Sequence, residues 1–127
     1  MRAFVIVDTG PLVAYFDRDS EHHDWVRLHA SRLEPGWLTS EAVLGEAGHL
    51  LRRAGVGADE LLELVENRLL VVPLQLEEEA SALRRLLRRY RSVPMSLADA
   101  TLVRLSEQYE NCHVFTLDSD FVIYRRF

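Results

Sequence analysis

Acidic side chains recur in this chain at the places where open α/β sheets put their ligands, the carboxyl ends of strands and the helix turns that follow. Asp8 directly follows the apolar run 3–7, and Asp118 follows another short apolar run, with Asp120 two residues further on. Asp99 lies in the first turn of a predicted helix. If these elements form one parallel sheet, the carboxylates converge at one edge of it.

A glutamate can join them from a helix. Glu46 lies about one and a half turns into the predicted helix 41–54, beside Val43 and Leu50 on the apolar stripe. Burying an unpaired charge is costly, so a glutamate on the edge of such a stripe needs a partner or a function.

Each acidic residue also has a simpler explanation. Asp8 can cap the helix that follows it, and Asp99 can close a capping box with Ser96. Glu46 can extend along the apolar surface to reach solvent, and residues 118–120 can form an Asx turn. Taken together, however, several crowded carboxylates repel one another, and folding tolerates such crowding when a cation binds them.

The ligand types indicate which cation and which chemistry to expect. Oxygen ligands without cysteine or clustered histidine favour Mg²⁺ or Mn²⁺ over zinc. Such ions activate water and stabilise a leaving oxygen, which suits the hydrolysis of phosphodiester bonds. Thr9 and Thr116 are candidates to support a carboxylate or a bound water through hydrogen bonds.

Strands that alternate with helices must position these residues, and this alternation predicts a single α/β domain over residues 1–127. We expect three α/β/α layers around a central parallel sheet of about five strands. The predicted strands are 3–7, 37–38, 69–74, 113–116 and, as a last edge strand or tail, 121–126. The predicted helices are 11–16, 21–32, 41–54, 58–66, 77–90 and 97–109.

The composition excludes several classes of protein. All fifteen basic residues are arginine, which rules out a P-loop, a receiver-type phosphorylation site and Schiff-base chemistry. A phosphatase with an Asp-x-Asp nucleophile pair is disfavoured because Gly10 stands two residues after Asp8. The one cysteine, Cys112, and the absence of a long apolar run predict a cytoplasmic protein without a membrane segment.

Five arginines lie close together in the sequence, at positions 84, 85, 88, 89 and 91. They follow Glu77, Glu78 and Glu79 on the same predicted helix, so acidic residues begin this helix and basic residues end it. We expect a solvated helix face on which these arginines pair with the upstream glutamates. Contact with the phosphates of a nucleic acid is the alternative.

Four motifs together resemble the PIN domain, and within it the VapC-type ribonuclease toxins and their orphan relatives. They are Val7-Asp8-Thr9-Gly10-Pro11-Leu12, Leu38-Thr39-Ser40-Glu41-Ala42-Val43-Leu44-Gly45-Glu46-Ala47, Ser96-Leu97-Ala98-Asp99-Ala100 and Phe115-Thr116-Leu117-Asp118-Ser119-Asp120-Phe121. They occur in the family's order and spacing over essentially the whole chain. The resemblance places the family's acidic quartet on Asp8, Glu46, Asp99 and Asp118, with Glu41 the alternative to Glu46 and Asp120 the alternative to Asp118 or an auxiliary ligand.

The resemblance implies a Mg²⁺- or Mn²⁺-dependent endoribonuclease in which Asp8, Asp99 and Asp118 bind metal and Glu46 helps to hold or activate the attacking water. It also implies an RNA substrate, a homodimer and, in a toxin–antitoxin pair, a small antitoxin that blocks the site. The net charge of −5 departs from the more basic surface of many RNA-binding members. The alternative function is a catalytically silent module that acts by binding RNA or protein.

Overall fold

Four parallel strands form the centre of the molecule. The computed structural model describes residues 3–117, and within them the strand order is β3-β2-β1-β4. The strands are β1 (Phe4–Val7), β2 (Trp37–Leu38), β3 (Leu70–Val71) and β4 (Cys112–Phe115). The parallel sheet confirms the predicted α/β fold. It has four strands within the described residues, where the sequence predicts about five for the chain, and the predicted strand 121–126 lies outside this range.

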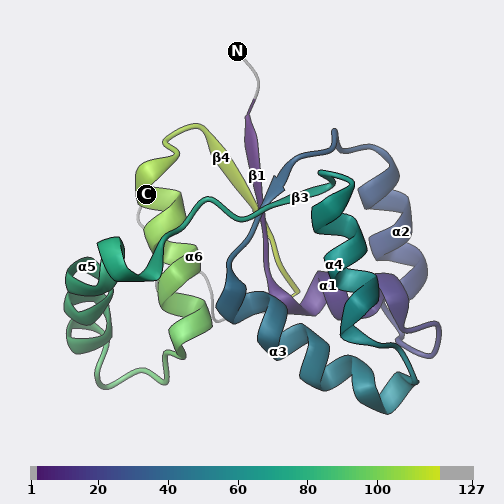
Figure 1. Ribbon diagram of the computed structural model, residues 1–127, viewed down its shortest axis with the longest axis horizontal. Coiled ribbons are helices and arrows are strands. Elements are labelled where there is room, and N and C mark those ends of the chain that lie inside the picture. The colour runs from purple at the N-terminus through teal and green to yellow at the C-terminus, as the bar shows by residue number, and fades with distance from the viewer. Residues whose placement is uncertain (1–2, 118–127) are drawn as a thin grey trace.

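Helices cover both faces of this sheet. They are α1 (Thr9–Phe16), α2 (His23–Ser31), α3 (Glu41–Leu51) with its 3₁₀ extension η1 (Arg52–Ala54), α4 (Ala58–Glu66), α5 (Leu76–Arg89) and α6 (Leu97–Gln108). Figure 1 shows α5 and α6 on one side of the strands and α1, α2 and α4 on the other. No helix within residues 3–117 combines the length and the apolar character needed to cross a membrane.

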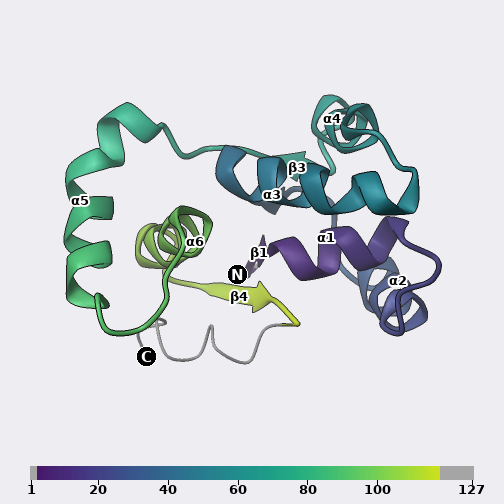
Figure 2. The same cartoon turned by 90° about the horizontal axis from the view of Figure 1, so that it is seen from below.

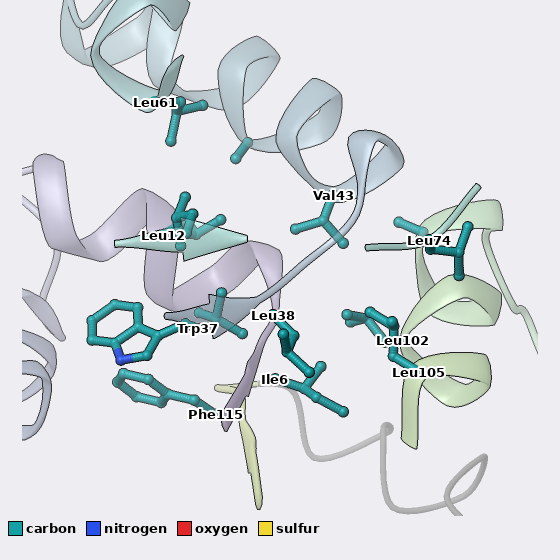
Figure 3. Close-up of a cluster of buried hydrophobic side chains, with 14 of the residues drawn as sticks. Ile6, Leu12, Trp37, Leu38, Val43, Leu61, Leu74, Leu102, Leu105 and Phe115 are labelled. Carbon is teal, nitrogen blue, oxygen red and sulfur yellow. The ribbon is translucent and has the colours of Figure 1, made fainter. Parts of the chain in front are cut away.

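Successive residues of a strand point to opposite faces of the sheet, so apolar side chains form one layer on each face. Ile6 and Leu38, which are aligned in the β1–β2 pairing, lie against Leu102 of α6 (Figure 3). Trp37 and Phe115 lie on the other side of the sheet, with their ring centroids 6.2 Å apart. The second half of β1, Ile6 and Val7, is thus buried on both faces as its apolar sequence predicts, whereas Phe4 at its start is exposed.

Serine side chains cap two of the helices that begin at the carboxyl end of the sheet. The hydroxyl of Ser40 accepts a hydrogen bond from the Val43 N–H and caps α3. Ser96 caps α6 in the same way, and this capping box is the one that the sequence predicts. At its far end α3 passes into η1 and stops at Gly55, whose positive φ of 73° suits a residue without a side chain.

Candidate active site

A pocket of about 480 Å³ opens at the carboxyl end of β1. Its walls come from one side of α1, from the second half of α3 and from the first turn of α6, and Figure 2 shows these three helices around β1. Asp8, Glu46 and Asp99 all line it. A larger hollow of about 600 Å³ lies at the amino end of the strands, but it is lined mainly by apolar side chains such as Trp37 and Tyr109. The acidic pocket is therefore the candidate site.

Asp8 is buried, with 6% of its surface exposed, and its carboxylate is held at both oxygens. Oδ1 accepts a hydrogen bond of 2.6 Å from the Thr9 N–H, which makes Asp8 the N-cap of α1. Oδ2 accepts a hydrogen bond of 2.8 Å from the Thr116 hydroxyl. The β1–β4 register explains the second contact, because Val7 is aligned with Phe115 and the next residue of each strand leaves the sheet side by side.

The two threonines support Asp8 differently. Thr116 donates from its side chain, as the sequence predicts, whereas Thr9 donates from its backbone. The Thr9 hydroxyl is buried and has no hydrogen-bond partner among the residues that the structure describes. An unsatisfied buried hydroxyl costs free energy, and a polar ligand bound beside Asp8 would give it a partner.

Asp99 caps α6, so its simpler explanation is confirmed. Its Oδ2 accepts a hydrogen bond of 3.1 Å from the Ser96 N–H, and its own N–H donates to the Ser96 hydroxyl at 3.0 Å. Asp99 nevertheless lines the pocket and is only partly exposed. A carboxylate has two acceptor oxygens, so capping with one of them is compatible with ligand binding by the other.

Glu46 reaches the pocket as an exposed side chain. It lies at the edge of the apolar stripe, as the sequence indicates, and its carboxylate carries no burial cost there, because α3 buries Val43 and Ala47 and leaves Glu46 exposed at the pocket. Its alternative, Glu41, is also exposed and lines a different hollow, together with Leu76 and Leu97. Of the two glutamates, the structure brings Glu46 to the same pocket as Asp8.

The described residues supply part of an acidic centre. Asp118 and Asp120 lie outside residues 3–117, and within this range no three His, Cys, Asp or Glu side chains approach closely enough to share one metal ion. The acidic groups that line the pocket are carboxylates, which suit the hard cations Mg²⁺ and Mn²⁺. The donor chemistry and the unsatisfied Thr9 hydroxyl fit such an ion.

Sequence reasoning missed one acidic residue of the pocket, Asp17. Gly10, Val13, Ala14 and Asp17 all line the pocket, and their spacing of three and four residues places them on one face of a helical segment. This periodicity was the signal that could have found Asp17. The same face explains Gly10, since a Cβ at this position would lie only 3.3 Å from the Cβ of Leu117.

Comparisons with known proteins agree with the observed fold. No curated protein matches the chain. Among solved structures, VapC20 of Mycobacterium tuberculosis, a toxin described as cleaving the sarcin-ricin loop, has 21% sequence identity and a TM-score of 0.78, with 94% of this chain and 93% of that chain covered. This likeness shows a shared fold. The family model of the PIN domain matches residues 5–126, so the chain belongs to the PIN-domain family.

Proposed function

We propose that this protein is a Mg²⁺- or Mn²⁺-dependent endoribonuclease and that it is the toxin of a toxin–antitoxin pair. The observation that carries the proposal is the buried carboxylate of Asp8, held at both oxygens and lining a pocket with Asp99 and Glu46. Membership of the PIN-domain family and the fold shared with VapC20, which is itself described as an RNA-cleaving toxin, support it.

In this proposal Asp8, Asp99 and Asp118 bind the metal ion, with Asp120 as an auxiliary or alternative ligand. When bound, the ion supplies Lewis-acid stabilisation of the charge that develops on the phosphodiester. The Thr9 N–H and the Thr116 hydroxyl keep the Asp8 carboxylate in one orientation. Glu46 orients the attacking water and accepts its proton, a task that its exposed carboxylate at the pocket wall can perform.

The test is RNA cleavage with Mg²⁺ or Mn²⁺ by the wild type and by Asp8→Asn. Asparagine keeps the shape of the side chain and an oxygen for the Thr9 N–H but removes the charge. We expect a loss of about a hundredfold or more in rate, the scale of losing one electrostatic contact to the reacting groups. Asp59→Asn on exposed α4 makes the same change of charge and should keep full activity. Metal-dependent cleavage that survives Asp8→Asn would refute the assignment.

The alternative function is a catalytically silent module that acts by binding RNA or protein. Within residues 3–117 the carboxylates do not by themselves form a three-ligand cluster. Calorimetric titration with Mn²⁺ separates the two functions, because a nuclease of this type must bind the ion and a silent module need not. Absence of heat at millimolar Mn²⁺ would favour the silent module.

The partners follow from the same proposal. A small antitoxin that blocks the pocket should be encoded in the neighbouring reading frame. We expect it to be a short protein with an N-terminal DNA-binding segment. We also propose a homodimer, and sedimentation velocity of the purified protein checks it by the mass of the main species.

A further inference from the structure

The C-terminal half of α5 and the turn after it concentrate positive charge on an acidic protein. Residues 80–98 contain five of the fifteen arginines and no Asp or Glu, whereas the rest of the chain has ten arginines against twenty acidic residues. We call these five residues the arginine face. They are Arg84, Arg85, Arg88, Arg89 and Arg91, and all are exposed.

The expected pairing of the arginine face with the upstream glutamates is wrong. Ion pairs along a helix join residues three or four apart, and the first arginine of the face, Arg84, lies five residues beyond the last glutamate, Glu79. Glu79 instead uses both oxygens on α6, where Arg104 donates to one and Gln108 to the other. In the part of the chain that the structure describes, none of the five arginines makes an ion pair.

Two of the five arginines line a hollow of about 420 Å³ between α5 and α6. Arg85 and Arg89, one helical turn apart, line it together with Arg104. The hydrogen bond to Glu79 raises the pKa of Arg104, and Glu107 also pairs with its guanidinium. Glu79 and Glu107 therefore compensate the positive charge of Arg104, and the uncompensated positive charge at this hollow comes from Arg85 and Arg89.

The chain that leaves the arginine face leads to the start of α6, one wall of the candidate site. The 90–96 loop that leaves α5 runs into the first turn of α6, which carries Asp99. Figure 1 shows this loop at the same end of the molecule as the first turns of α1 and α3. A chain of phosphates that crosses α5 can therefore continue over the start of α6 to the Asp8 pocket.

We propose that the arginine face binds the phosphates of a single-stranded segment of RNA and leads it to the Asp8 pocket, an inference that rests on the proposed function. Guanidinium groups suit phosphates because their planar set of N–H donors matches two phosphate oxygens at once. The acidic remainder of the surface repels RNA, so long-range attraction must come from a local group of this kind. Arginines at two successive turns of one helix offer several contacts to a continuous backbone.

Fluorescence anisotropy of a labelled single-stranded RNA of mixed sequence, measured in EDTA over a series of NaCl concentrations, tests the inference without any need for cleavage. The double variant Arg85→Gln/Arg89→Gln removes two contacts to phosphate. We expect the slope of log K against log [NaCl] to fall by about 1.4, since each phosphate contact on a single strand contributes about 0.7.

The matched control is Arg52→Gln/Arg53→Gln, which changes the net charge equally but lies in exposed η1, across the molecule from α5 (Figure 1). This control should keep the wild-type slope. Equal slopes for the wild type and the Arg85/Arg89 variant, or an equal fall in both double variants, would overturn the proposal. Circular dichroism melting of each variant checks that the exposed substitutions leave the fold intact.

Cleavage kinetics separate this inference from the proposed function. If both hold, Arg85→Gln/Arg89→Gln raises KM for RNA and leaves kcat unchanged. If the wild type binds RNA through these arginines but cuts no RNA, the proposed role of the arginine face is supported and the proposed ribonuclease activity is refuted. Cleavage of RNA by the wild type, with the same KM for Arg85→Gln/Arg89→Gln, would support the ribonuclease and refute the role of the arginine face. Displacement of the RNA by polyglutamate at equal charge concentration would assign the face to an acidic protein partner and overturn the RNA assignment.

Discussion

Asp8 has two structural roles in addition to its proposed chemical role. Its carboxylate satisfies an N–H at the start of α1, where a negative charge also interacts favourably with the helix dipole. The same carboxylate accepts the hydroxyl proton of Thr116, a residue 108 positions further along the chain. Because the second contact requires β1 and β4 to be paired, the orientation of Asp8 depends on the completed sheet.

Thr116→Val removes this hydroxyl while keeping the branched shape of the side chain. Groups that orient a metal-binding carboxylate affect metal affinity by about ten- to a hundredfold, so we expect a loss of that size. Calorimetric titration with Mn²⁺ measures it. Thr116→Ser, which keeps the hydroxyl, should retain affinity close to that of the wild type. Equal affinities for the valine and serine variants would show that the contact does not act on the metal site.

At the scale of elements, α6 connects the stability of the fold to the geometry of the site. Its buried face packs against the sheet through residues such as Leu102 and Leu105, which have no exposed surface. Its first turn holds Asp99 through the capping box. A change at this cap should therefore affect both the helix and the acidic residue in its first turn.

Ser96→Ala deletes the hydroxyl that accepts from the Asp99 N–H, while the Ser96 backbone can still donate to the Asp99 carboxylate. Loss of an N-cap side chain costs about 1 kcal/mol of unfolding free energy. Urea denaturation followed by circular dichroism measures this cost. The control is Ser92→Ala in the preceding loop, an exposed position where we expect a change within about 0.5 kcal/mol. If the two variants are equally stable, the capping box does not contribute to the fold.

Elements differ in how well sequence patterns predict them, and the reasons are physical. The helix 58–66 has the bounds of α4, and Ser96 marks the start of α6, because periodicity and capping are local properties. The strand predicted over 69–74 shortens to β3 (Leu70–Val71), since its length depends on how many residues β2 offers for pairing. The pairing expected for the arginine face failed because its first arginine, Arg84, lies five residues beyond Glu79, too far for a pair along the helix, and Glu79 contacts Arg104 of α6 instead.

The candidate site also has features that the sequence predicts and features that depend on tertiary packing. Its location could be predicted, because the carboxyl ends of parallel strands meet at one edge, and Asp8 and Asp99 do line one pocket there. The exposure of Glu46 could not, since it depends on how α1 and α3 face each other across the pocket, whereas the helical spacing of Gly10, Val13, Ala14 and Asp17 could have indicated Asp17. The double role of Asp99 as cap and pocket residue shows why neither explanation alone was sufficient.

At the scale of the whole molecule, the proposed metal ligands come from residues 8, 99 and 118, which are distant in sequence. Only the folded chain brings such residues together, so Mn²⁺ should stabilise the folded state against the unfolded one. At a concentration of about 100 Kd, binding adds about 2.7 kcal/mol, which corresponds to a rise in Tm of roughly 10 °C for a domain of this size. Asp8→Asn should lose most of this rise, whereas Asp59→Asn should keep it. A rise of equal size in both variants would place the bound ion away from Asp8, and an unchanged Tm in the wild type would mean that the acidic pocket holds no metal in the folded protein.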